Sequence, residues 1–111
     1  MQHDLTDAVE WAVKAGVTEA GKVGIFGGSY GGYAVLAGLA FTPELYACGV
    51  DIVGPSNAKT LLESIPAWWV LMKQQLVLRV GDVENDEDFN KRISPVHHAE
   101  KMRSPLLIVQ G

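Results

Sequence analysis

The stretch from residue 24 to residue 33 reads Gly24-Ile-Phe-Gly-Gly-Ser-Tyr-Gly-Gly-Tyr33. A short apolar run from Lys22 to Gly27 precedes its serine and predicts a strand buried on both faces. The residues from Ser29 to Phe41 are mostly small or aliphatic and favour a helix, which Thr42 and Pro43 end. The pattern Gly-x-Ser-x-Gly therefore lies where a buried strand passes into a helix.

This position gives the pattern a chemical meaning. A serine on a sharp strand-to-helix turn has strained backbone angles and projects its hydroxyl above the sheet, as in the nucleophile elbow of an α/β-hydrolase. Ser29 is the predicted nucleophile. We expect side chains at Gly27 and Gly31 to collide with the turn and the neighbouring strand. Gly32 and Gly38 are expected to let the helix pack closely on the sheet.

The turn also offers a site for negative charge. A helix that begins after the serine directs unpaired N–H groups and the positive end of its dipole at this point. The backbone N–H of Tyr30 is accordingly the expected first donor of an oxyanion hole. A serine nucleophile also needs a base and a group that orients the base. In α/β-hydrolases these follow in the order Asp or Glu, then His.

The histidines do not fit that order. His97 and His98 precede the last predicted strand, so no acid-bearing strand end separates them from Ser29. We interpret both as residues of a surface helix. His3 comes before the nucleophile and does not fit either.

Helices and strands alternate along the rest of the chain. Apolar residues at helical spacing predict a helix from Asp4 to Ala15, with Asp4 as its N-cap and Gly16 as its stop. Such alternation predicts right-handed crossovers and a parallel sheet. The other predicted elements are a buried strand at Tyr46–Val53, helices over Thr60–Leu78 interrupted at Pro66, a solvated acidic loop or helix start at Gly81–Lys91, a short helix at Val96–Met102 and a buried strand at Pro105–Gln110.

Two features of the middle of the chain have open alternatives. Asp51 lies inside a predicted strand, where it either bonds to loop backbone near the strand end or lines an active-site cleft. Trp68 and Trp69 follow Pro66, and they either form a cap over a substrate cleft or pack against the rest of a larger domain.

Composition limits the possible functions. The chain has 111 residues, 48% hydrophobic and 20% charged, with a formal net charge of −4. This is typical of one globular domain and gives no electrostatic case for binding nucleic acid or an anionic membrane. The lone Cys48 forms no intramolecular disulfide, and no ligand spacing indicates a metal, so we expect neither metal nor cofactor. No signal segment and no membrane-spanning run is visible, so we expect a soluble protein of unknown compartment.

The segment Gly24–Tyr33 resembles the active-serine segment of the prolyl oligopeptidase family of serine peptidases, which includes dipeptidyl-peptidases and acylaminoacyl-peptidases. Three further stretches resemble the same family, namely Asp4–Trp11, Gly49–Asn57 and Ser94–Gly111. Together they cover essentially all 111 residues. The resemblance implies that residues 1–111 are part of an α/β-hydrolase catalytic domain, truncated at both ends. It implies a segment of parallel sheet with three neighbouring strands, helices on both faces, and exposed edges and apolar faces.

The resemblance also implies a function. Hydrolysis of a peptide substrate would proceed through an acyl-enzyme, with Ser29 as nucleophile and Tyr30 donating its N–H to the oxyanion. The triad Asp and His would lie beyond Gly111. Partners within the parent chain would be the rest of the catalytic domain and, as is common in the family, a β-propeller. Two alternatives stay open, a carboxylesterase with the same elbow and an inactive fragment that only associates with its complementary pieces.

Overall fold

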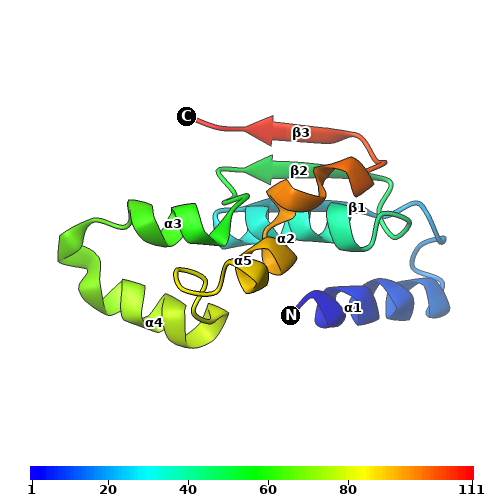
Figure 1. Cartoon of the computed structure of the whole chain (residues 1–111). Coiled ribbons are helices and arrows are strands. Elements are labelled where there is room, and N and C mark those ends of the chain that lie inside the picture. The colour runs from blue at the N-terminus through cyan, green and yellow to red at the C-terminus, as the bar shows by residue number, and fades with distance from the viewer.

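The computed structural model describes all 111 residues as a three-stranded parallel sheet with helices packed against it (Figure 1). The strands lie side by side in the order β1-β2-β3, which confirms the predicted parallel patch of neighbouring strands. The elements are, in chain order, α1 (Gln2–Lys14), β1 (Gly24–Gly28), α2 (Tyr30–Phe41), β2 (Cys48–Ile52), α3 (Ala58–Ser64), the 3-10 helix η1 (Ala67–Trp69), α4 (Val70–Val80), α5 (Glu87–Ile93), the 3-10 helix η2 (Pro95–Lys101) and β3 (Leu106–Val109).

One face of the sheet carries the main core. Helix α2 packs on β1 and β2, and its buried Val35 and Leu39 meet Tyr46 there. Close packing depends on small residues at the contact, as predicted for Gly38. A Cβ at Gly38 would stand 2.9 Å from the Tyr46 ring, and one at Gly49 would stand 2.7 Å from Leu39.

The opposite face of the sheet is bare. The register places Phe26, Val50 and Leu107 in one row on this face, with Ile52 and Val109 two residues further along. Phe26 is 72% exposed and Leu107 60% exposed. We expected strands buried on both faces and helices on both faces, but the helices of this chain cover only the α2 side. The exposed apolar face that the family resemblance implied is present. An apolar row of this kind needs a covering layer that these elements do not supply.

A second core lies beside the sheet. Buried Ala58, Leu62 and Val83 pack together there, and side chains from α4 and α5 surround them. The predicted interruption at Pro66 is confirmed, because α3 ends at Ser64 with an extended residue after it and η1 begins after the proline. Figure 1 shows α3 and α4 as a bent arm at the end toward which the strands point.

Local boundaries differ from expectation at two helices. Helix α1 begins at Gln2, so Asp4 lies in its first turn and is not its N-cap, while Gly16 follows the helix with a φ of +74°. The segment after Ser94 is a 3-10 helix from Pro95 to Lys101, where we expected a short helix from Val96. None of the helices combines the length and the apolarity that crossing a bilayer requires.

Candidate active site

Ser29 occupies a strained turn at the end of β1. Its backbone has φ 55° and ψ −118°, a combination that residues with a side chain rarely adopt. Two hydrogen bonds hold the turn. The Ser29 N–H donates to the carbonyl of Ile52 at 2.9 Å, and the Ser29 carbonyl accepts from the Tyr33 N–H at 3.1 Å. The strained backbone predicted from the sequence is thus present, enforced by β2 on one side and by α2 on the other.

Glycines make this turn possible through close backbone approaches. A Cβ added at Gly27 would run into the backbone of Gly31, and one at Gly32 would run into the Asp51 carboxylate and the backbone of Gly54. The collision expected at Gly31 itself is wrong, because a Cβ there meets nothing within 4 Å. Gly31 matters as the backbone that Gly27 touches. Gly27 and Gly32 are therefore the positions of the turn at which only glycine fits.

A matching turn follows β2. Val53 also has a positive φ, 50°, and its N–H donates to the carbonyl of Val109 at 2.8 Å. Asp51 is 2% exposed, and its Oδ1 accepts the N–H of Gly54 at 2.8 Å. The structural interpretation of Asp51 is therefore correct, since its carboxylate closes the loop after the strand. The two non-glycine residues with positive φ thus lie at the same edge of the sheet, on neighbouring strands.

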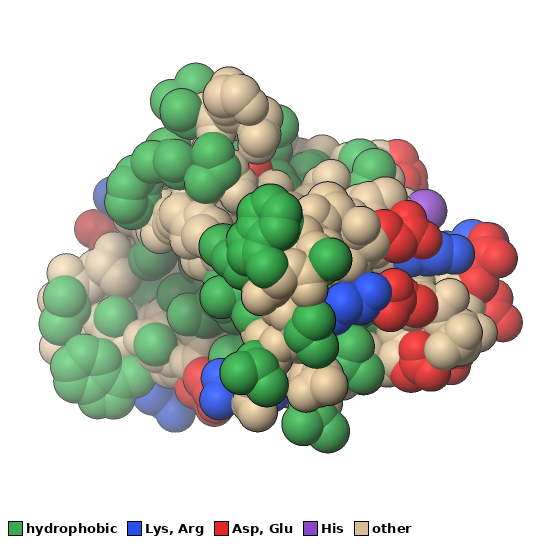
Figure 2. Space-filling model, turned by 90° about the vertical axis from the view of Figure 1, so that its left-hand side faces the viewer, with side chains coloured by type: hydrophobic (Ala, Val, Ile, Leu, Met, Phe, Trp, Pro, Cys, Tyr) green, Lys and Arg blue, Asp and Glu red, His purple; other side chains and the backbone are tan.

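A groove of about 630 Å³ opens over this edge. Ser29 and Tyr30 form one side of it, and α3 with η1 and α4 form the other. Its lining residues are Ser29, Tyr30, Val53, Gly54, Pro55, Ser56, Asn57, Thr60, Leu61, Ser64, Ile65, Trp69, Met72, Leu76 and Gln110. None of these side chains carries a charge. Figure 2 shows the same end of the molecule, where hydrophobic side chains gather over much of the surface and most of the charged ones lie on the right of the view.

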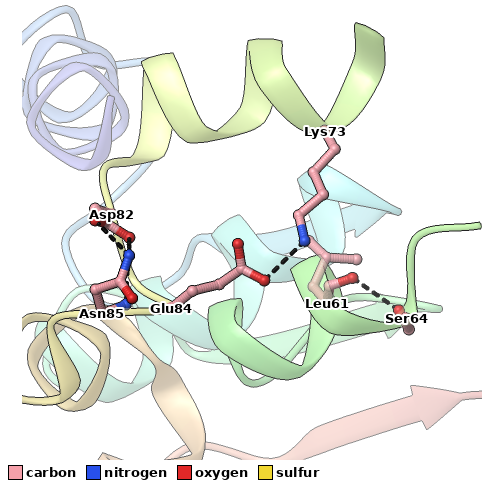
Figure 3. A network of polar contacts seen from close by, with 6 residues as sticks. All are labelled: Leu61, Ser64, Lys73, Asp82, Glu84 and Asn85. Carbon is pink, nitrogen blue, oxygen red and sulfur yellow. Dashed lines mark hydrogen bonds and ion pairs between the residues drawn. The ribbon is translucent and has the colours of Figure 1, made fainter. Parts of the chain in front are cut away.

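The arm that forms the far wall of the groove is held by polar contacts. Lys73 on α4 donates to Glu84 at 2.7 Å across the turn that follows the helix (Figure 3). Asn85 donates to both carboxylate oxygens of Asp82 in the same turn. On α3 the hydroxyl of Ser64 donates to the carbonyl of Leu61 at 2.8 Å. Trp69 lines the groove while Trp68 is 81% exposed, so the two neighbouring tryptophans have different surroundings.

Tyr30 contributes a backbone donor beside the serine. It is the first residue of α2, so its N–H has no acceptor within the helix and forms part of the positive end of the helix dipole. Its ring lies 5.5 Å from the ring of Tyr33. Burial raises the pKa of Tyr30, and burial followed by the nearby Tyr30 raises the pKa of Tyr33. Both phenols therefore stay protonated and neutral near neutral pH.

None of the three histidines of this chain lines the groove beside Ser29. His97 and His98 lie on η2, as expected for surface positions, and neither lines the groove. The His98 ring lies near the Lys91 carbonyl, 2.9 Å from Nε2, and packs edge-on against Phe41. His3 belongs to α1 and is also absent from the groove lining. The site consists of a serine, a backbone donor and a neutral groove.

Some site residues had no signal in the sequence. Thr60, Leu61 and Met72 line the groove, although their helical spacing alone indicates only a packed face. The positive φ of Val53 was also unexpected, because a β-branched residue is the least suited to it. The dipeptide Gly54-Pro55 directly after it is the one hint of a sharp turn at that point.

Comparison with known proteins places the whole chain in one group. The profile of the prolyl oligopeptidase family matches residues 1–111. Dipeptidyl aminopeptidase BIII of Pseudoxanthomonas mexicana is 53% identical, over 100% of this chain and 16% of that protein. Dipeptidyl peptidase family member 6 of Caenorhabditis elegans is 43% identical, over 100% of this chain and 15% of that protein. The chain therefore spans about one sixth of the length of these curated relatives.

Comparison of the backbone with solved structures agrees with this result. A puromycin-hydrolyzing peptidase of Mycobacterium tuberculosis matches with a TM-score of 0.81 and 26% sequence identity. The match covers 94% of this chain and 16% of that one. The expected fold, a partial α/β-hydrolase with a parallel sheet, is confirmed.

Proposed function

Because this chain belongs to the prolyl oligopeptidase family, we propose that it supplies the nucleophile of a serine peptidase and that Ser29 is that nucleophile. The observation that carries the proposal is the Ser29 backbone, with its φ of 55° on the turn between β1 and α2. Surrounding contacts must enforce such a conformation in a non-glycine residue, and strained residues of this kind cluster at reactive sites. The groove beside it offers space for a substrate.

The chemistry follows from the parts around the serine. The Ser29 Oγ attacks the carbonyl carbon of the scissile peptide bond while a base takes its proton. The oxygen that becomes negative is stabilised by the N–H of Tyr30, one donor of the oxyanion hole. Collapse of this intermediate breaks the C–N bond, and the base gives its proton to the leaving amine. Water then hydrolyses the ester on Ser29 and restores the hydroxyl.

We place the base and its orienting acid elsewhere in the full-length protein. None of the three histidines lines the groove, and neither does any carboxylate. The order Ser, then Asp or Glu, then His in α/β-hydrolases agrees with both groups following these residues.

The proposed substrate is a peptide with an uncharged side chain next to the scissile bond. The groove has no charged lining residue, and Trp69, Met72 and Leu76 give it an apolar part. An apolar, uncharged lining disfavours a charged side chain, because the charge would lose its hydration without gaining a partner. Two relatives are named as dipeptidyl peptidases, which supports release of dipeptides from a peptide N-terminus.

A labelling experiment on the full-length protein tests the role of Ser29. A fluorophosphonate probe should label the protein, and Ser29→Ala should abolish both labelling and hydrolysis of a dipeptidyl aryl amide, by about 10⁴-fold or more. Ser104→Ala is the matched control, because Ser104 lies before β3, outside the groove lining, and should leave labelling intact. Labelling that persists in Ser29→Ala would contradict the proposal.

The carboxylesterase alternative uses the same elbow and would give the same labelling. Comparing a dipeptidyl aryl amide with an aryl ester of the same acyl group separates the two functions. A peptidase hydrolyses both, with loss of both in Ser29→Ala. Hydrolysis of the ester alone would make the protein an esterase.

A further inference from the structure

Two buried polar side chains lie outside the groove, and both form hydrogen bonds to the same segment of backbone. Asn90 on α5 is 3% exposed, and Ser94, which directly follows α5, is 0% exposed. Neither lines the groove. Burying polar groups is unfavourable unless each finds a hydrogen-bond partner. The partners of this pair lie more than 30 residues away along the chain.

Both side chains bind the start of α3. The Ser94 Oγ accepts the N–H of Ala58 at 3.0 Å and donates to the Asn90 Oδ1 at 2.9 Å. The same Asn90 oxygen accepts the N–H of Lys59 at 2.9 Å. Ala58 and Lys59 are the first two residues of α3, whose N–H groups have no acceptor inside the helix. We call Asn90 and Ser94 the α3 anchor.

The α3 anchor is also connected to the Ser29 turn. The hydroxyl of Tyr33 on α2 donates to the carbonyl of Ile93, the residue before Ser94, at 2.9 Å. The Tyr33 N–H in turn donates to the carbonyl of Ser29 at 3.1 Å. Tyr33 is partly buried and stays protonated, because burial raises its pKa. A continuous chain of contacts therefore runs from the serine, through Tyr33 and the end of α5, to the start of α3.

Helix α3 is part of the groove wall opposite Ser29 and Tyr30. Thr60, Leu61 and Ser64 on this helix line the groove, as does Asn57, which caps it by accepting the Lys59 N–H at 3.0 Å. The wall has few backbone bonds to the sheet, since α3 is separate from the strand ladder and belongs to the second core. Its position relative to Ser29 accordingly depends on the α3 anchor, together with the second core that holds Leu62 and the Val96 N–H that donates to the Ser56 carbonyl at 3.0 Å.

We propose that Asn90 and Ser94 are positioning residues that hold the α3 wall in place against Ser29 and thereby set the affinity for the substrate. The proposal rests on the proposed function of Ser29. It predicts an effect on substrate binding and none on the reactivity of the serine, because the elbow is held by main-chain hydrogen bonds, from the Ser29 N–H to the Ile52 carbonyl and from the Tyr33 N–H to the Ser29 carbonyl, which side-chain substitutions leave in place. Neither anchor residue touches the reacting atoms.

The test uses the full-length protein with Asn90→Ala and Ser94→Ala. Each variant should raise KM for a dipeptidyl aryl amide about tenfold and change kcat by less than about twofold, since buried hydrogen bonds are lost on the wall only. The rate of Ser29 labelling by a small fluorophosphonate should stay within about twofold. Asn90→Asp keeps the acceptor oxygen for Lys59 and Ser94, so it should bring KM back toward that of the unmodified protein.

A gentler variant covers the case in which an alanine variant fails to fold. Tyr33→Phe keeps the ring and removes only the hydroxyl that binds Ile93, and it should raise KM about threefold with labelling unchanged. An unchanged KM in the folded variants would overturn the inference. So would labelling that falls in parallel with peptide turnover, because that result indicates a merely structural role. Absence of labelling in the unmodified protein would instead overturn the proposed function of Ser29, and this inference with it.

Discussion

Two regions meet at the groove, and they are held by different means. The elbow region, residues 24–54, is shaped by its backbone, with glycines in close contact and positive φ angles at Ser29 and Val53. The arm, formed by α3 and α4, is held by side chains, through the α3 anchor, the contact between Lys73 and Glu84, and the apolar cluster around Leu62. Both regions line the same groove.

The difference separates two tasks within one site. A turn defined by backbone contacts has no slack, since almost any added atom at Gly27 or Gly32 collides with main chain. A wall attached through side chains can be shifted by single substitutions that leave the turn intact. With the roles proposed above, the reactivity of Ser29 and the affinity for the substrate can therefore change independently.

The largest expected effect comes from the lack of a catalytic base in both regions. The isolated 111-residue chain should show no hydrolysis of peptide or ester above background, because no histidine or carboxylate lines the groove beside Ser29. Loss of the base removes several orders of magnitude, roughly 10⁴ to 10⁶, from the rate of a serine hydrolase. A chromogenic dipeptidyl amide and an aryl ester, with Ser29→Ala as background, check this. Turnover that Ser29→Ala abolishes would show that these residues suffice.

The next effect tests the rigidity of the elbow region. Gly32→Ala in the full-length protein should lower the free energy of unfolding by about 3 kcal/mol, because the new Cβ overlaps Asp51 and Gly54. It should also slow fluorophosphonate labelling, because α2 must shift relative to the turn. Gly31→Ala on the same helix is the control, since its Cβ meets nothing within 4 Å. Urea unfolding and labelling rates measure both, and equal costs at the two glycines would contradict the steric account.

A core substitution in the arm should behave differently. Leu62 is 2% exposed, and Leu62→Ala should lower the free energy of unfolding by about 2–4 kcal/mol while Ser29 labelling persists. Leu71→Ala on α4 is the counterpart, because Leu71 is 79% exposed and its loss should cost less than about 0.5 kcal/mol. Unfolding followed by tryptophan fluorescence measures both. A large cost at Leu71 would reveal that another part of the protein covers this face of α4.

The smallest effect involves an exposed pair on α5. The hydrogen bond and charge of Lys91 lower the pKa of Glu87, so the pair contributes stability above the glutamate pKa of the unfolded chain and loses it as pH falls through the lower folded value. Because both side chains are solvated, the contribution is small and screened by salt. The difference in unfolding midpoint between the unmodified protein and Glu87→Gln should be present at neutral pH. A difference that persists in strong acid would contradict this assignment.

Sequence patterns predicted the elbow region better than the arm. The glycines that permit the turn at Ser29 lie within a few residues of it and are visible in the sequence, whereas its hydrogen bond to Ile52 joins segments more than 20 residues apart. The exception is Gly31. Gly27 and Gly31 are in contact, and the sequence alone does not show that a side chain would collide at Gly27 and would fit at Gly31. The break at Pro66 was equally local and was predicted correctly.

The missed features depend on contacts between distant segments. Asn90 and Ser94 bind backbone groups more than 30 residues away, and nothing near them in sequence indicates this partner. Strand burial was overestimated at Phe26 and Leu107 for a related reason. An apolar run indicates that both faces of a strand are suited to burial, but it does not show which other segment covers each face.

The hydrogen bond from the Ser29 N–H to the Ile52 carbonyl has a consequence for timing. Ile52, whose carbonyl accepts this bond, is synthesised more than 20 residues after Ser29. The N–H of Val53, the next residue, donates to the carbonyl of Val109 on β3. A nascent chain that has emerged only as far as Ser29 therefore lacks both hydrogen bonds that hold the strained turn. The strained turn at Ser29 therefore depends on strands that are made after it, and its full set of contacts is present only once the three-stranded sheet is assembled.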